Sequence, residues 1–177
     1  SNNLANLINH GFDCISMTLD PIKWKQFMKH SFFEFGNFFR PTEMALFAIP
    51  VHVAISYQIP LLFYGENVLY TTTFGTTKEG KDGNAQKLKE GNTVKGGPKS
   101  LKIKNVKKSD YHFYEYPSYA KMNKANLKLV YLGYYMKDWY AYKNAKIAIE
   151  KGLEIRKDHP GEMGDLWGYA ALDEDFR

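Results

Sequence analysis

Cysteine is almost absent from this chain of 177 residues, in which Cys14 is the only one. A single cysteine excludes an internal disulfide and any metal cage made only of cysteines. The longest apolar stretch, MALFAIPVHVAI, is shorter than the roughly 18 residues of a membrane span, and it contains Pro50 and His52. No basic segment followed by an apolar one marks a signal peptide. We therefore expect a cytoplasmic protein without a membrane span.

Patterns that mark a metal site or a catalytic nucleophile are missing too. The five histidines show no metal-ligand spacing, and the sequence intervals suggest no Ser/His/Asp arrangement. The sequence therefore predicts no metal-ligating residues and leaves the catalytic residues unidentified. Cys14 lies in an apolar segment, and we expect it to be a core residue.

The chain is rich in residues that build a core. Apolar residues make up 44% of it and aromatic residues 16%, a composition typical of folded proteins. A length of 177 residues suits one α/β domain better than two. We therefore expect a single domain over residues 1–177.

The net charge of +5 comes from one segment of the chain. Between Lys78 and Lys108, ten lysines face only Glu79, Asp82 and Glu90, a local excess of +7. The rest of the chain is therefore slightly acidic. Because the basic residues are confined to one segment, they do not mark the whole surface as a nucleic-acid interface. A solvated loop explains them equally well.

Local signals predict alternating helices and strands. Asp20 suits an N-cap and Pro21 the first helical position, whereas Gly11 and Gly152 suit helix ends. Pro50 is expected to kink or divide the buried helix that contains it. The expected helices cover residues 2–10, 20–35, 42–58 and 138–151, and the expected strands cover 12–18, 59–65 and 126–136. This alternation predicts an α/β fold with a parallel sheet and helices on both faces.

Residues 71–125 differ from the rest because they are rich in Gly, Lys, Thr and Asn. They are expected to form a long Gly/Lys-rich loop with one short helix near residues 85–90. A loop of this length within a compact domain is usually functional or disordered.

The stretch GEN, Gly65 to Asn67, follows directly on an apolar strand. In parallel α/β sheets, ligands bind outside the carboxyl ends of the strands. Gly65 would let a ligand approach the backbone closely, and Glu66 and Asn67 would offer it an acceptor and an amide. A polar turn that caps the next segment is the alternative.

Three further polar motifs are ambiguous. Asp82–Asn84 and Gly91–Thr93 are typical turn sequences. Lys95–Gly97, of sequence KGG, is able to cradle a phosphate with backbone amides beside a lysine. It lacks the following helix and the Ser or Thr in register that a P-loop requires.

Five stretches carry a resemblance to a known family: NLINHGFDCI, FFEFGNFFRPTEMALFAIPVHVAISYQIPLLFYGEN, DGNAQKLKEGNTVKGG, LKLVYLGYYMKDWYAYKNAKIAIEKGLE and GDLWGYAALDEDF. Together they resemble the N-acetyl sugar amidotransferases of bacterial surface-polysaccharide biosynthesis, which are ATP-using enzymes of the PP-loop superfamily. The stretches occur in the order found in the family and cover most of the chain.

The resemblance implies an incomplete Rossmann-like fold of the PP-loop type, also described as adenine nucleotide alpha hydrolase-like. The family's nucleotide-binding loop, of Ser-Gly-Gly-Lys-Asp-Ser type, is absent from residues 1–177 and is expected upstream of Ser1. The family pattern also continues past Arg177. Many relatives carry cysteine near the position of Phe39, and its absence here argues against a metal site at that turn.

The resemblance also implies ATP with Mg²⁺, a nucleotide-linked N-acetyl sugar from lipopolysaccharide O-antigen synthesis, and a glutaminase subunit that supplies ammonia. The Gly/Lys-rich loop would be a lid over the sugar, and Glu66 and Asn67 would orient the nucleotide or the acetamido group. The candidate binding residues are Gly65, Glu66, Asn67, Asp82, Asn84, Asn92, Lys95, Arg40 and Glu43.

Other functions fit the same sequence. One is a tRNA-modifying enzyme of the PP-loop superfamily, and another is a non-enzymatic nucleic-acid-binding module that uses Lys78 to Lys108. A third is a scaffold whose lysine-rich loop docks a glutaminase. An incomplete sheet exposes an edge and apolar surface, so self-association into a homo-oligomer is also plausible.

Overall fold

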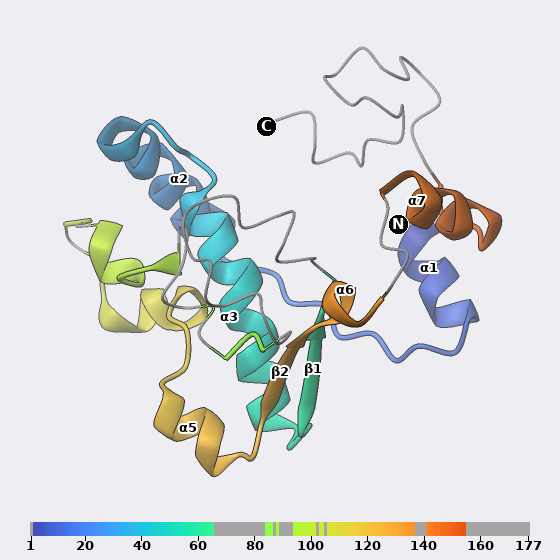
Figure 1. Ribbon diagram of the computed structural model, residues 1–177. Helices are drawn as coiled ribbons and strands as arrows, with labels where there is room; N and C mark the ends of the chain where they lie inside the picture. The colour runs from blue at the N-terminus through green and yellow to red at the C-terminus, as the bar shows by residue number, and fades with distance from the viewer. Residues whose placement is uncertain are drawn as a thin grey trace. The chain divides into compact units, whose positions relative to one another are not determined.

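The computed structural model describes residues 2–65, 84–86, 88, 94–101, 103–104, 106–136 and 141–154 (Figure 1). The chain divides into two compact units, one made of Ser1–Ser16 with Lys137–Arg177 and the other of Met17–Met136. A single domain over residues 1–177 stays a prediction. Every helix within the described ranges is too short or too polar to cross a membrane.

The first unit joins the two ends of the chain through helices α1 (Asn2–Asn9) and α7 (Ala141–Glu150). Both lie where the sequence predicts helices. The Asn3 side chain accepts from the backbone N–H of Glu154 at 2.8 Å and donates to its carbonyl at 3.1 Å. The Asn6 amide donates to the Lys151 carbonyl at 3.0 Å. Two asparagines one turn apart on α1 therefore satisfy backbone groups that the end of α7 leaves unpaired.

Gly152 ends α7 with a φ of +91°, and a Cβ added there would lie 2.8 Å from Oδ1 of Asn6. We expect Gly152→Ala to lower the free energy of unfolding by about 2 kcal/mol, because it combines an unfavourable φ with a displaced asparagine. Urea denaturation measures this loss. Gly11→Ala is the matched control, since its φ is +86° but no atom lies within 4 Å of the added Cβ. Equal losses in the two variants would contradict the role of Asn6.

Helix α2 (Pro21–Phe35) in the second unit follows from local signals. Oδ1 of Asp20 accepts from the backbone N–H of Ile22 at 2.9 Å and of Lys23 at 3.3 Å, so Asp20 is the N-cap, as predicted. Gly36 ends the helix with a φ of +65°.

Helix α3 (Arg40–Ser56) continues through Pro50 and is not divided there. Proline has no N–H, so the carbonyl of Leu46 loses its partner one turn earlier. The Leu46 side chain is 59% exposed, which places this turn of the helix at the surface, where water can replace the missing donor. The helix therefore tolerates Pro50.

Strands β1 (Leu61–Tyr64) and β2 (Lys128–Tyr131) pair in parallel, with Tyr64 opposite Tyr131 (Figure 1). Short helix α6 (Leu132–Tyr135) follows β2 directly. The predicted α/β class with parallel strands is confirmed in this coarse form. The finer Rossmann-like PP-loop arrangement stays a prediction.

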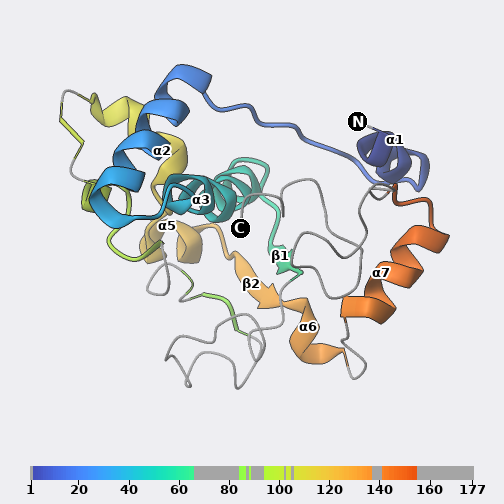
Figure 2. The ribbon, with the colours of Figure 1, turned by 90° about the horizontal axis from the view of Figure 1, so that it is seen from above.

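Helix α3 is central to the second unit and packs against the sheet on one side and against α2 on the other (Figure 2). On the sheet side its Ala48, Val51 and Ala54 are buried in one cluster with strand residues such as Tyr64 and Leu129. On the other side, Phe27, Met44, Ala45, Leu101 and Tyr114 form a second buried cluster.

The opposite face of β1 presents Leu61, which is 41% exposed, and Phe63, which is 55% exposed. In the described part of the chain, helix α3 covers one face of the sheet. Helices on both faces stay a prediction.

The later part of the predicted loop at 71–125 contains regular elements that belong to the core. These are the 3₁₀ helices η3 (Pro98–Leu101) and η4 (Lys108–Tyr114) and helix α5 (Tyr119–Lys124). Leu101 and Met122 are fully buried, and Tyr114 is nearly so. The apolar residues here are spaced irregularly among lysines, so no single helical or strand period reveals them.

The predicted strand over residues 12–18 is wrong, because this segment has no regular structure. Cys14 is exposed, so the prediction of a core cysteine is wrong as well. Phe12, at 62% exposed, and Ile15, at 52%, are not packed either. An apolar run forms a strand only where a neighbouring strand pairs with it, and no described residue does so here.

Candidate functional site

The carboxyl ends of β1 and β2 lie at the same edge of the sheet, because the strands are parallel and in register. Gly65 follows β1 at this edge, and α6 follows β2. A Cβ added to Gly65 would meet no atom within 4 Å, so open space lies beside it. The predicted residues Glu66, Asn67, Asp82 and Asn92 lie outside the described residues. The place of Glu66 and Asn67 at this edge, and the binding roles of Asp82 and Asn92, stay predictions.

Asn84 lies against β2. It forms an isolated antiparallel bridge with Val130, and the neighbouring Ala85 N–H donates to the Leu129 carbonyl at 3.0 Å. The Asn84 side chain accepts from the N–H of Gln86 at 2.8 Å. These contacts give Asn84 a structural part in extending the sheet.

The fold brings together Arg40 and Lys95, two candidate binding residues that lie 55 positions apart in the sequence. The Arg40 Nη2 donates to the Ser100 hydroxyl at 3.0 Å and to the Lys95 carbonyl at 3.4 Å, and its guanidinium lies 4.6 Å from the Phe35 ring centroid. Glu43, one turn further along α3, is half-buried. Arg40 thus links the start of α3 to the turn before η3.

The KGG motif forms a tight turn. Gly96 and Gly97 have φ values of +83° and +59°, and the Gly97 N–H donates to the Val94 carbonyl at 3.0 Å. The Ser100 hydroxyl donates to the Gly97 carbonyl at 2.7 Å. Because the Gly97 amide is already hydrogen-bonded within the turn, the structure favours the turn over the phosphate cradle.

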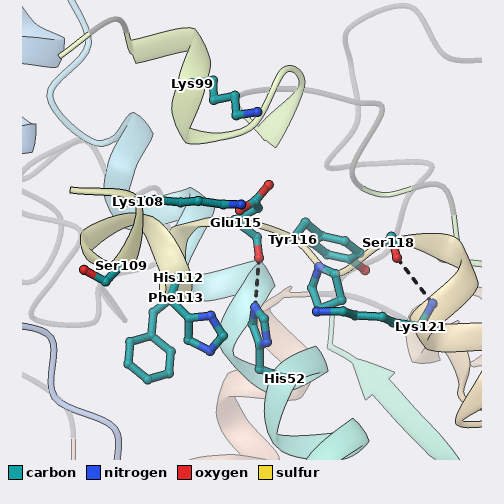
Figure 3. Close-up of a pocket in the computed structure, with 11 residues that line it drawn as sticks. His52, Lys99, Lys108, Ser109, His112, Phe113, Glu115, Tyr116, Ser118 and Lys121 are labelled. Atoms are coloured by element: carbon teal, nitrogen blue, oxygen red, sulfur yellow. Dashed lines mark hydrogen bonds between the residues drawn. The ribbon is translucent and has the colours of Figure 1, made fainter. Parts of the chain in front are cut away.

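A pocket with a volume of about 970 Å³ lies where α3, η3, η4 and the start of α5 meet (Figure 3). Helix α3 contributes His52, and η4 contributes His112. Three lysines, one from each of η3, η4 and α5, reach the pocket. Its charged and imidazole-bearing lining residues are His52, Lys99, Lys108, His112, Glu115 and Lys121.

His52, which α3 contributes, lies close to His112 in the lining of this pocket (Figure 3). Its Nε2 lies 2.8 Å from the Glu115 carbonyl, and its ring centroid lies 4.6 Å from that of His112. A carbonyl only accepts, so Nε2 carries the proton and donates. Burial lowers the pKa of His52 below its usual 6.5, and the charges of His112 and Lys121 add to this effect. His52 is therefore neutral at pH 7.

The lysines of the pocket are not neutralised by carboxylates. Among the described residues, Lys99, Lys108 and Lys121 have no carboxylate oxygen within 4.0 Å. Within the described part of the chain, Glu115 is the one acidic residue in the lining. The pocket therefore carries a net charge of +2 even when both histidines are neutral.

Sequence reasoning missed this pocket. His52 and His112 lie 60 positions apart, one on a buried helix and the other in a segment predicted to be a loop. No spacing rule joins them. The one signal in the sequence that could have pointed to the pocket was the run of lysines around Lys99 and Lys108. Such a run is equally typical of a solvated loop.

The described residues bring together no group of three or more His, Cys, Asp or Glu side chains able to hold a metal ion. Mg²⁺ is usually held by one or two carboxylates together with substrate phosphates, so its part in the implied reaction stays a prediction. No protein-family model and no curated protein matches the chain. The resemblance to the sugar amidotransferases consequently stays a prediction.

Proposed function

We propose that the chain is part of an ATP-dependent amidotransferase that converts the N-acetyl group of a nucleotide-linked sugar into an acetamidino group. The observation that supports this most directly is the parallel pairing of β1 and β2. It brings Gly65 to the same sheet edge as the YLGYY stretch. Both belong to segments that carry the resemblance to the sugar amidotransferases. This is the edge at which open α/β sheets of the proposed Rossmann-like PP-loop type bind nucleotides.

The proposed reaction overcomes the low reactivity of an amide carbonyl. The acetamido oxygen attacks the α-phosphorus of ATP and releases pyrophosphate, which makes the oxygen part of a good leaving group. Ammonia then attacks the carbon, and the C–O bond breaks to release AMP. The carbon keeps the new nitrogen as an acetamidino group, and the excess protons pass to solvent.

Ammonia is the scarce reactant in this scheme, because at neutral pH it is mostly protonated and not nucleophilic. A glutaminase subunit that releases ammonia next to the activated sugar solves this problem. ATP and nucleotide-linked sugars are cytoplasmic substrates, so we propose that the protein works in the cytoplasm. Nothing in the scheme requires nucleic acid.

The test uses the natural polypeptide that contains this chain, mixed with its glutaminase partner, amide-labelled glutamine, ATP, Mg²⁺ and a panel of nucleotide-linked N-acetyl sugars. Mass spectrometry should show a sugar in which labelled nitrogen has replaced one oxygen, with AMP formed in equal amount. No labelled product from any sugar in the panel would contradict the proposal. Residues 1–177 alone should not turn over ATP, because they lack the Ser-Gly-Gly-Lys-Asp-Ser loop. ATP turnover by the isolated chain would contradict its being an incomplete domain.

A further inference from the structure

We propose that the pocket lined by His52, His112 and Lys121 binds a small organic molecule that bears a diphosphate. Among the described residues, neither Gly65, which follows β1 directly, nor α6, which follows β2 directly, lines this pocket. It is therefore a site separate from the sheet edge, and the inference does not depend on the proposed amidotransferase reaction.

Charge is the first argument. Lys99, Lys108 and Lys121 come from three different elements and line one concavity (Figure 3). Grouping like charges destabilises a fold unless an anion or solvent screens them, and one carboxylate does not balance three ammonium groups. Figure 3 shows the Lys121 side chain extending from α5 back toward His52. A multiply charged phosphate group would contact several of these lysines at once and form charge-assisted hydrogen bonds to them.

Size is the second argument, and it indicates more than a free phosphate ion. The volume of about 970 Å³ is at the upper end of the roughly 300–1,000 Å³ of small-molecule pockets. A neighbouring hollow of about 680 Å³ shares His52, His112, Phe113 and Lys121 with it. The lining of that hollow is largely apolar and includes Met17, Val53 and Ile55. A ligand would fit the pocket and the neighbouring hollow together if its phosphates lay among the lysines and its organic part lay against the apolar side chains.

The shape of the basic surface favours a small molecule over a nucleic acid. Nucleic acids are bound along extended basic stripes or grooves that follow the phosphate backbone. Here the lysines converge on one pocket whose wall also includes Phe113, the buried Tyr116 and the acidic Glu115.

Isothermal titration calorimetry of the full chain at low salt tests the site with inorganic pyrophosphate, uridine diphosphate and uridine. We expect both phosphate compounds to bind and uridine to bind much more weakly. Uridine diphosphate should bind more tightly than pyrophosphate if the neighbouring hollow receives the organic part. The double variant Lys99→Gln/Lys121→Gln should weaken both phosphate ligands by about tenfold or more.

Two charge-matched variants are the controls. Lys25→Gln/Lys29→Gln removes the same charge from exposed positions on α2, outside the pocket lining, and should leave affinity within about twofold. Lys81→Gln/Lys87→Gln removes the same two positive charges from the basic segment between Lys78 and Lys108. Circular dichroism establishes that each variant is folded, and Lys108→Gln replaces the pocket pair if that pair unfolds.

Three outcomes would overturn the proposal. The first is that pyrophosphate and uridine diphosphate fail to bind at millimolar concentration in low salt. The second is that a control pair weakens binding as much as the pocket pair does. The third is that a short single-stranded DNA binds more tightly than uridine diphosphate and is displaced by neither phosphate ligand, which would make the basic surface a nucleic-acid site.

Discussion

Replacing Phe27 with alanine is expected to remove about 3–5 kcal/mol from the free energy of unfolding of residues 17–136. Phe27 is fully buried, and its ring centroid lies 4.9 Å from that of Tyr114 and 5.5 Å from that of Tyr111. Alanine would lose these aromatic contacts and leave a cavity between α2 and η4. Because domains are typically stable by only about 5–15 kcal/mol, this variant should be close to unfolding at 37 °C.

Phe33→Ala on the same helix is the matched control for Phe27→Ala. Phe33 is 74% exposed, so its removal deletes the same atoms but creates no internal cavity. We expect a change within about 0.5 kcal/mol. Urea denaturation followed by circular dichroism measures both variants. If Phe27→Ala lowered the free energy of unfolding no more than Phe33→Ala does, the packing of α2 against η4 would not contribute to the stability of this unit.

The second large effect concerns activity. Glu66→Gln should lower kcat/KM of the proposed amidotransferase reaction by about a hundredfold, because the carboxylate after β1 would position the nucleotide or the acetamido group. The measurement is the rate of labelled product formation by the natural polypeptide with its glutaminase partner. Glutamine keeps the size of glutamate but replaces one acceptor oxygen with an NH₂ donor, so the variant removes the charge and one acceptor together.

Glu34→Gln is the control for Glu66→Gln, because it makes the same chemical change at an exposed position on α2. It should leave the rate unchanged within about twofold. A comparable loss in both variants would assign the effect to net charge. A loss of less than about threefold at Glu66 would remove this residue from the site and leave the sheet edge without its proposed acidic group.

The sequence predicted best where a local interaction decides the structure. Asp20 and Pro21 act within one helical turn, and α2 begins where they predict. At Pro50, where the sequence predicted a kink or a division, α3 is not divided and continues to Ser56. The missing hydrogen bond is tolerable because that turn of α3 is at the surface, and exposure depends on the neighbouring elements.

Prediction failed where distant parts of the chain decide the outcome. The apolar residues around Cys14 match a strand, but no described segment pairs with them. The irregular, lysine-rich segment around Leu101 and Met122 reads as a loop, but it supplies much of the core next to α3. Burial depends on what packs against a residue, and composition does not record this.

The amino-acid sequence by itself determined where α2 begins and which two apolar runs form the parallel strands that bring Gly65 to one edge of a sheet. Helix caps, glycine turns and apolar runs each involve only a few neighbouring residues, so they can be recognised in the sequence. Only the tertiary structure decided that His52, His112 and three lysines share one pocket. These residues come from four separate elements, and the packing of those elements on α3 brings their charges together.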